Sequence, residues 1–230
     1  MAIVPEPIES YAAAHSTAES EVLGALAAHT RAATPAPGMM TGHLEGRFLE
    51  MLVFAVQPTL VVEVGTFTGY GSISMASVLS PGGRVITCDV NEATTAVARK
   101  FAEEAGVADR IEFRLGPALD TIATIAEPID LAFIDADKSG YRDYFDAILA
   151  KLSPHGLIAI DNVLWGGSVV EPPRDDERPD TQALRELNDE LVRDERIVCV
   201  MTTIRDGVTL VRKRTEGYAG SGPAGEVSGK

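Results

Sequence analysis

The feature that most constrains the fold is an alternation that begins at Thr59, in which short β-branched runs are separated by longer stretches rich in Ala, Leu, Arg and Glu. Such alternation is typical of β-α-β units, where crossover helices join parallel strands. The runs are almost continuously apolar, which indicates strands buried on both faces of the sheet. Five parallel strands are therefore expected, at 59–65, 84–89, 111–115, 131–135 and 157–161.

Helical spacing of apolar residues fills the intervals between these runs, and Gly or Pro lies near the end of each interval. Crossover helices are expected at 72–79, 92–105, 118–126 and 141–152. Two further β-branched runs, 197–204 and 208–212, are separated by a turn containing Asp206 and Gly207, which is a hairpin signal. The prediction is an α/β, Rossmann-like fold: a doubly wound, seven-stranded, mostly parallel sheet that ends in an antiparallel C-terminal hairpin strand.

Three segments make up the expected domain organisation. Residues 1–58 form an N-terminal helical appendage of the same domain, with one Ala-rich helix over 8–30 and a second helix over 44–56. Residues 59–214 form the core, which includes a Pro-rich charged loop at 171–180. Residues 215–230 are rich in Gly and Ser and are expected to be a disordered tail. We expect the appendage to supply a lid or dimer contacts.

Composition excludes several classes of partner. The formal net charge of −14 repels polyphosphate and anionic lipid, so nucleic acid and membrane surfaces are not expected partners. The longest purely apolar stretch, 51–56, is far shorter than a membrane span, and the first residues lack the basic flank of a signal peptide. The two cysteines, Cys88 and Cys199, lie in apolar runs and are interpreted as buried small hydrophobic residues. We expect a cytoplasmic protein.

A glycine-rich turn follows the first strand, with Gly65, Gly69 and Gly71 ahead of a helix. Glycines let the backbone approach a ligand closely, and the helix start offers free N–H groups. At the end of the second strand, Asp89 is placed to accept both hydroxyl hydrogens of a ribose. Together these signals favour an adenosine-type ligand. The alternatives are a purely structural turn and an N-cap role for Asp89, for which Asn91 is the better candidate.

Acidic residues cluster at the ends of the fourth and fifth strands. Asp135, Asp137 and Lys138 follow the fourth strand, and Asp161 and Asn162 follow the fifth. Carboxyl ends of parallel strands meet at one sheet edge, which is where open α/β sheets bind ligands. Hard oxygen donors without histidine or thiolate suit Mg²⁺, Mn²⁺ or Ca²⁺ rather than zinc. Helix capping and loop hydrogen bonding are the alternative explanation.

These motifs, in this order over roughly 39–214, resemble the cation-dependent S-adenosylmethionine O-methyltransferases of the caffeoyl-CoA and catechol type. The resemblance rests on 63–70, Asp89, 116–119, 133–138, 161–168 and 206–210. It implies a class I methyltransferase core, with a metal ion held by Asp135, Asp161 and Asn162. It also implies that the methyl donor contacts Met39, Glu63, Gly65, Thr66, Phe67, Tyr70, Ser72, Asp89, Ala118, Asp135 and Asp137.

The resemblance further suggests an acceptor site bordered by Met40 and Trp165, although core packing is the alternative for the methionines. Glu45 and Gly46 match the family's N-terminal Glu-Gly pair, while Arg47 replaces the usual glutamine. Relatives of this type commonly form homodimers, and we expect the same here.

The expected chemistry is methylation of a catechol-like phenolic small molecule. A phenol has a pKa of about 10, so a cation that contacts both oxygens of a vicinal diol stabilises the phenolate. Lys138 is the proposed general base, with an ion pair to Asp137 or Asp135 as the alternative. A caffeoyl-CoA-type ester is the alternative acceptor. A non-catalytic adenosine-binding module and an NAD-type oxidoreductase are the competing functions, and the absence of G-x-G-x-x-G disfavours the latter.

Overall fold

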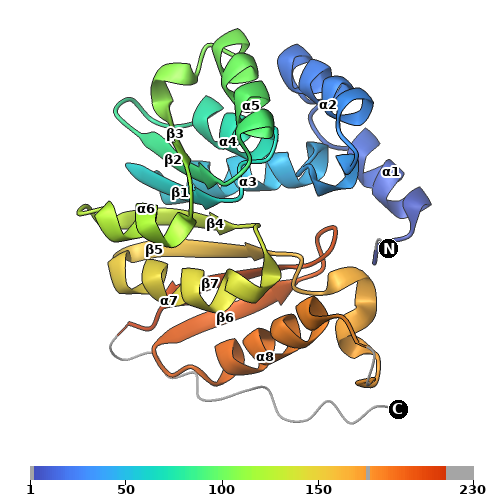
Figure 1. Ribbon diagram of the computed structural model, residues 1–230, viewed down its shortest axis with the longest axis vertical. Coiled ribbons are helices and arrows are strands. Elements are labelled where there is room, and N and C mark those ends of the chain that lie inside the picture. The colour runs from blue at the N-terminus through green and yellow to red at the C-terminus, as the bar shows by residue number, and fades with distance from the viewer. Residues whose placement is uncertain (1–2, 175–176, 216–230) are drawn as a thin grey trace.

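The structure is a computed structural model that describes residues 3–174 and 177–215. Within these residues the chain forms one seven-stranded sheet of order β3-β2-β1-β4-β5-β7-β6, which runs through the middle of the molecule (Figure 1). The strands are β1 Leu60–Val64, β2 Arg84–Asp89, β3 Ile111–Leu115, β4 Ile129–Ile134, β5 Leu152–Asp161, β6 Ile197–Thr202 and β7 Val208–Lys213. From residue 216 onward, the expected tail lies outside the described residues.

The first five strands are parallel, and β7 lies antiparallel between β5 and β6. The predicted α/β fold with an antiparallel C-terminal hairpin is therefore confirmed. The bounds predicted for β2 and β3 agree with the structure, whereas β5 begins five residues before the predicted 157. The added stretch exists because Leu152 pairs with Ile129 across a register shift that precedes the regular ladder.

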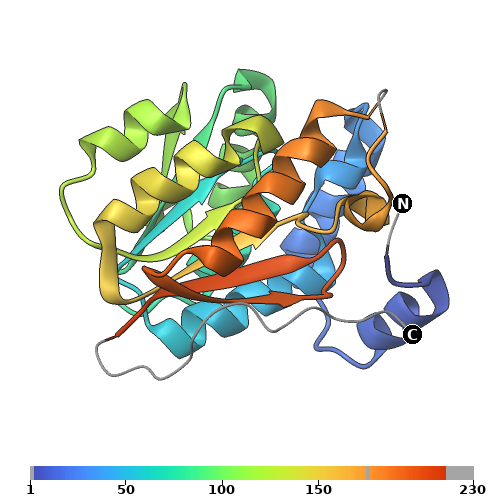
Figure 2. The ribbon, with the colours of Figure 1, turned by 90° about the horizontal axis from the view of Figure 1, so that it is seen from below.

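Helices cover both faces of the sheet, as expected for strands buried on both sides (Figure 2). Helices α3 His43–Val56, α4 Tyr70–Ser77 and α5 Glu92–Glu104 contribute to one apolar core, with α2 Glu21–Ala33 packed outside them. Helices α6 Ala118–Thr124, α7 Tyr141–Lys151 and α8 Pro179–Arg193 pack in a second core on the opposite face. Short 3₁₀ turns lie at Pro37–Met39, Ala108–Arg110, Lys138–Gly140 and Trp165–Val170.

The prediction of a single helix over 8–30 was wrong. The segment forms two helices, α1 Glu6–Ala14 and α2, because polar side chains compete for the backbone between them. The Ser16 hydroxyl donates to the carbonyl of Ala12 at 2.8 Å, and the Ser20 hydroxyl accepts from Leu23 N at 3.3 Å as the N-cap of α2. The separation lets α1 and α2 take different directions (Figure 1).

Helix α8 was not among the predicted elements, and its start also shortens the predicted loop at 171–180. Pro179 occupies its first turn, where the missing N–H is not needed. Leu184, Leu187 and Leu191 then recur at helical spacing and are all buried in the core of the opposite face. This helix supplies the crossover that places β6 at the edge of the sheet.

The predicted hairpin between β6 and β7 is confirmed, and its turn contacts the loop after β5. Gly207 has a φ of 86°, and a Cβ atom there would lie 2.6 Å from Leu164 Cγ. Arg205 in the same turn has a φ of 48°, in the left-handed region. The hairpin turn is therefore fixed against the end of β5, near the acidic residues singled out above.

No helix within the described ranges is long and apolar enough to cross a membrane. Cys88 on β2 is buried, Cys199 on β6 is partly buried, and both are free thiols.

Candidate active site

The glycine-rich turn after β1 packs directly on the end of β4. Gly65 has a φ of 102°, and a Cβ atom there would lie 2.0 Å from the backbone oxygen of Asp135. Gly69 has a φ of 88°, and its Cβ would lie 2.6 Å from Ala98 Cβ on α5. Both positions require glycine for local packing. The turn therefore brings the predicted donor-binding residues and the predicted cation ligands to one edge of the sheet.

Asp89, at the end of β2, holds this turn in place. Its Oδ2 accepts from the backbone N–H groups of Thr66, at 3.1 Å, and Phe67, at 2.7 Å. Its Oδ1 accepts from Asn91 N at 2.8 Å. Asn91 itself caps α5, accepting from Ala93 N at 3.0 Å. The N-cap alternative for Asp89 is thereby excluded, because Asn91 takes that role.

Glu63 lies buried beneath the first turn of α4 and is 1% exposed. It accepts hydrogen bonds from the hydroxyls of Ser72 and Thr87, the latter at 2.6 Å. Burial raises the pKa of Glu63 to about 8. The fit is close, since a Cβ atom on Gly71 would lie 2.5 Å from Glu63 Oε1. Glu63 and Ser72, both expected to contact the methyl donor, are therefore joined to each other.

Four other residues that are expected to contact the methyl donor lie in separate local environments. The Thr66 hydroxyl lies 2.6 Å from that of Thr87, and Phe67 is partly buried against the α3–α5 core. Tyr70 is 2% exposed and donates its hydroxyl to Glu19 Oε2 at 2.6 Å, so this hydroxyl points to the N-terminal appendage. Ala118 is buried at the start of α6.

Lys138 lies at the centre of the acidic strand ends and is 8% exposed. Its Nζ is 3.1 Å from Asp135 Oδ1, 2.6 Å from Asn162 Oδ1 and 2.5 Å from the Tyr141 hydroxyl. The ion pair with Asp135 that the sequence allowed as an alternative is therefore present. The ammonium group bridges two of the three predicted cation ligands.

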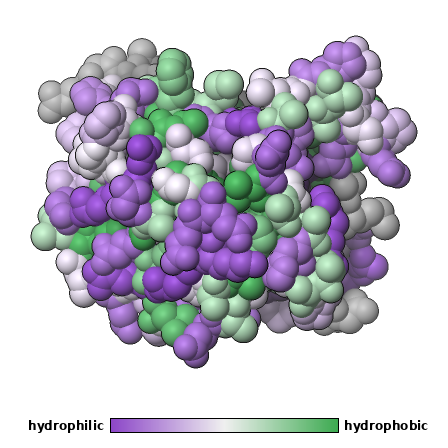
Figure 3. All heavy atoms as spheres, turned by 90° about the horizontal axis from the view of Figure 1, so that it is seen from above, coloured by the Kyte–Doolittle hydropathy of each residue, from purple (hydrophilic) through white to green (hydrophobic). Residues whose placement is uncertain are grey.

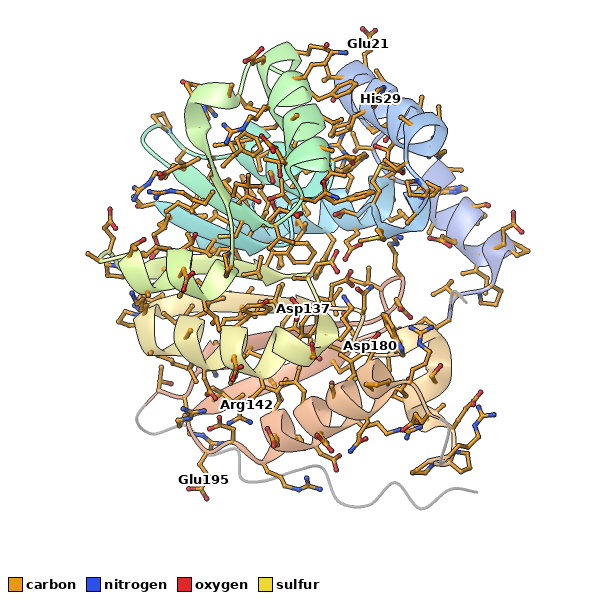
Figure 4. The ribbon with its side chains drawn as sticks, in the orientation of Figure 1. Glu21, His29, Asp137, Arg142, Asp180 and Glu195 are labelled. Carbon is orange, nitrogen blue, oxygen red and sulfur yellow. The ribbon has the colours of Figure 1, made fainter. Side chains whose placement is uncertain are left out.

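Asp137 is turned away from Lys138. Its carboxylate accepts from the hydroxyls of Tyr144, at 2.7 Å, and Ser139, at 3.2 Å. Figure 4 labels Asp137 near the middle of the molecule, whereas Arg142, in the first turn of α7, lies lower in the view. Asp137 is therefore a separate acidic group beside the predicted cation ligands, and its ion pair with Lys138 is not formed.

Asp161, the last residue of β5, is 3% exposed. Burial, assisted by the charge of Asp135, raises the pKa of Asp161 to about 7. The neighbouring Asn162 has a φ of 59°, a left-handed conformation that asparagine tolerates better than most residues. This turn at the strand end directs the Asn162 amide oxygen to Lys138.

Glu45, which the resemblance matched to the family's Glu-Gly pair without assigning it a role, lies in the first turn of α3. It is 1% exposed, and burial, followed by the charge of Asp161, raises the pKa of Glu45 well above its ordinary value. Its position could have been found from the spacing of α3, because Glu45 shares the buried face of that helix with Leu49 and Val53.

The oxygen atoms at the acidic strand ends are of the kind that bind a divalent cation. Asp135, Asp161 and Asn162 offer hard oxygen atoms, and Asp161 Oδ1 is buried with no donor in the described part of the chain. The Lys138 ammonium, a positive charge, already contacts two of the three groups. Within residues 3–174 and 177–215, no three Asp, Glu, His or Cys side chains form a preassembled metal cluster. Two carboxylates and an amide therefore fit a cation whose other ligands come from water or substrate.

Met39 and Met40 differ in how deeply they are buried. Met40 is 7% exposed and packs in the core with α3, so the core-packing alternative holds for it, whereas Met39 is 61% exposed. Trp165, with a φ of 46°, lies beneath two positive groups: Lys138 Nζ at 5.7 Å and Arg178 Cζ at 4.9 Å from its ring centroid. A recess of about 270 Å³ has a lining that includes Arg31, Met40, Thr41, His43 and Arg205.

Comparison with known proteins gives this site a family. Residues 13–214 match the family model described as O-methyltransferase. The chain is 35% identical to the probable caffeoyl-CoA O-methyltransferase 1 of Dictyostelium discoideum, over 90% of this chain and 91% of that protein.

Solved structures agree with this match. The SAH-bound methyltransferase PaMTH1 of Podospora anserina superposes with a TM-score of 0.84 at 27% identity, covering 93% of this chain and 99% of that one. The O-methyltransferase TomG of Streptomyces achromogenes, solved in complex with SAM, gives a TM-score of 0.80 at 29% identity, over 91% and 96% of the two chains. The chain therefore belongs to the S-adenosylmethionine-dependent O-methyltransferases, within the caffeoyl-CoA O-methyltransferase family.

Proposed function

We propose that this enzyme transfers the methyl group to one hydroxyl of a catechol-like small molecule and needs a divalent cation, Mg²⁺ in the first instance, to do so. The observation that carries the proposal is the convergence of Asp135, Asp161, Asn162 and Lys138 on one sheet edge. A methyltransferase that used a bare hydroxyl would not need two acidic groups beside its acceptor.

The methyl donor is proposed to lie along the glycine-rich turn. Support comes from the backbone N–H groups that Asp89 orders there and from the buried Glu63 behind them. Ser72 and Ala118 lie at the first turns of α4 and α6, where free N–H groups are available. Met39 is proposed to cover the methyl end, and Asp137 to face the methionine part.

Asp135, Asp161 and Asn162 would hold the cation. A cation bound there would supply Lewis-acid stabilisation of the phenolate of a vicinal diol and would help to orient the acceptor. The chain's own residues confine this arrangement, because Asp161 and Lys138 are both buried. Mn²⁺ or Ca²⁺ has the same preference for oxygen ligands and is the alternative ion.

Lys138 is proposed to accept the proton of the reacting hydroxyl. Support comes from its position, since Nζ contacts both Asp135 and Asn162, two of the three groups that would hold the cation. The Tyr141 hydroxyl, 2.5 Å from Nζ, keeps the lysine side chain from turning away. Trp165, which has a cationic group on its ring, is proposed to border the acceptor ring.

A coenzyme A ester is the second candidate acceptor. Its support is the 35% identity to a probable caffeoyl-CoA O-methyltransferase and the presence of Arg31, a phosphate-binding type of residue, in the lining of the recess. The overall charge of −14 favours the free catechol. A direct comparison of the two acceptors decides between them.

The experiment measures methyl transfer from S-adenosylmethionine to free catechols and to caffeoyl-CoA, with Mg²⁺ and with chelator. The variant is Asp161→Asn, and the matched control is Asp189→Asn, which changes an exposed carboxylate on α8 paired with Arg193. We expect Asp161→Asn to lose most activity at wild-type donor affinity, and Asp189→Asn to behave as wild type. Equal activity in Asp161→Asn and the wild type would refute the proposed cation site.

Homodimer formation is proposed from the side chains that the fold leaves exposed. Met51 and Phe54 on α3 are 65% and 71% exposed, and Val200 on the edge strand β6 is 55% exposed. The face over α2 and α5 instead mixes hydrophilic and hydrophobic side chains (Figure 3). Sedimentation of the wild type and of Phe54→Glu tests this: a dimer that the substitution dissociates supports it, and a monomeric wild type refutes it.

Two further expectations stay proposals. Residues 1–58 are proposed to belong to the same domain as the core. Supporting contacts are the Tyr70–Glu19 bond, that of the Thr30 hydroxyl with the Thr68 hydroxyl, at 2.9 Å, and that of Arg205 Nη1 with Glu45 Oε2, at 3.0 Å. A cytoplasmic location is proposed because both cysteines are free.

A further inference from the structure

Glu45 is a buried charged side chain that the chemistry described so far does not use. A carboxyl group at 1% exposure is stable only when its oxygens find partners. Glu45 Oε2 has one, because it accepts from Arg205 Nη1 at 3.0 Å. The pair joins the first turn of α3 to the β6–β7 turn, which lies 160 residues further along the chain.

Arg205 also fixes the segment that leads into α3. The same Nη1 atom donates to the Met40 carbonyl at 3.1 Å, and it lies 3.5 Å from the position that a Cβ on Gly42 would take. The backbone of Arg205 itself is held in the left-handed region at a φ of 48°. The carboxyl group of Glu45 is therefore anchored on one side by a side chain whose own position is constrained.

Glu45 also interacts with the carboxyl group of Asp161. Glu45 Oε1 and Asp161 Oδ1 are both buried, and neither has a donor among the residues that the structure describes. The two carboxyl groups are within hydrogen-bonding reach of each other. Two buried oxygens without donors are unfavourable, and one proton shared between the two carboxyl groups would join them by a hydrogen bond that satisfies both.

We propose that Glu45 is a positioning residue of the cation site, which is anchored by Arg205 and holds the carboxyl group of Asp161 in the orientation that ligates the cation. The inference rests on the proposed function, since Asp161 is a cation ligand only there. Hydrogen-bonding partners behind a metal ligand orient it and strengthen metal binding. Glu45 acts through Asp161 rather than as a ligand, because the described acidic side chains form no three-membered metal cluster.

The test is calorimetric titration of Mn²⁺ into the full-length protein, without methyl donor or acceptor. The variants are Glu45→Ala and Glu45→Gln. The matched control is Glu50→Ala, because Glu50 lies on the same helix, is 8% exposed and is ion-paired with Arg47 without touching the cation site. Thermal melting of each variant checks that it is folded, and Glu45→Met, which keeps the side-chain volume, replaces Glu45→Ala if the latter does not fold.

Glutamine separates positioning from charge. Its carbonyl can accept from Arg205 and its amide can donate to Asp161, so it preserves both contacts while removing the carboxyl group. We expect Glu45→Ala to weaken Mn²⁺ binding roughly 10- to 100-fold, and Glu45→Gln to stay within about threefold of wild type. Glu50→Ala should bind Mn²⁺ as the wild type does.

Either of two results overturns the inference: wild-type affinity in Glu45→Ala, or binding by Glu45→Gln that is as weak as that of Glu45→Ala. The second result would assign the effect to the negative charge of Glu45 rather than to its contact with Asp161. A wild-type protein that binds no Mn²⁺ would instead refute the cation dependence of the proposed function, and this inference with it.

Discussion

Replacing Gly65 by alanine should damage both stability and the cation site, because this glycine is where the end of β1 meets the end of β4. The added Cβ would lie 2.0 Å from the backbone oxygen of Asp135. A carbon–oxygen contact needs roughly 3.3 Å, so one backbone segment must move by about 1 Å. The segment that moves carries a predicted cation ligand.

Comparison with a second glycine, Gly82, separates the loss of stability into a backbone cost and a packing cost. Gly82 has a φ of 87°, close to the 102° of Gly65, but a Cβ on Gly82 meets no atom within 4 Å. Alanine in the left-handed region costs roughly 1–2 kcal/mol at either position. Only Gly65→Ala adds the overpacking cost of roughly 1–3 kcal/mol. The entropy that alanine removes from the unfolded chain is the same in both variants and cancels in the comparison.

Thermal and urea unfolding of the wild type, Gly65→Ala and Gly82→Ala measure this difference. At roughly 2–4 °C per kcal/mol for a chain of this size, Gly65→Ala should melt at least about 2 °C below Gly82→Ala. It should also bind Mg²⁺ more weakly, whereas Gly82→Ala should not. Equal melting temperatures for the two variants, with unchanged Mg²⁺ affinity, would refute the close approach of β1 to Asp135.

Three further predictions concern single side chains. Burial raises the pKa of Glu63 from 4.5 to about 8, so between these values the folded state binds more protons than the unfolded state, and stability falls as pH rises through that window. Glu63→Gln should flatten this fall when melting temperature is measured against pH. An unchanged pH profile would contradict the burial argument. Lys138→Ala should reduce the rate of methyl transfer roughly 10²- to 10⁴-fold if Lys138 is the general base, and a near wild-type rate across pH would exclude that role. Asp89→Ala should weaken binding of the methyl donor, as measured by calorimetry. Asn91→Ala should cost roughly 1 kcal/mol of stability through the lost cap of α5 and leave the affinity for the methyl donor unchanged. Equal affinity for the methyl donor in both variants would contradict the role of Asp89.

Much of the fold could be predicted because strand and turn signals in this chain are local. The β-branched runs at β2 and β3 gave correct bounds, and Asp206-Gly207 correctly indicated the hairpin. Glycines after β1 marked a turn that packing then explained. Helix α8 escaped prediction because charged and proline-containing sequence precedes it, although its buried leucines carried the helical period.

The candidate site was harder to predict where contacts join distant segments. The acidic strand ends could be found because parallel strands share one edge, and that reasoning applies to Asp135 and Asp161 alike. The helical spacing of α3 could have shown that Glu45 is buried, but its ion pair with Arg205 could not be predicted, since Arg205 lies 160 residues further along the chain. The bond of the Tyr70 hydroxyl to Glu19 could not be predicted either, because it depends on how the appendage packs.

The central claim is that a cation held at the acidic strand ends activates a vicinal diol. It is tested most directly by the rate of methyl transfer to a simple catechol and to the matching monohydroxyphenol, each measured in Mg²⁺ and after chelation. The account predicts methylation of the catechol in Mg²⁺, its loss on chelation, and no comparable methylation of the monohydroxyphenol. A rate that survives chelation, or a monohydroxyphenol methylated as fast as the catechol, would contradict it.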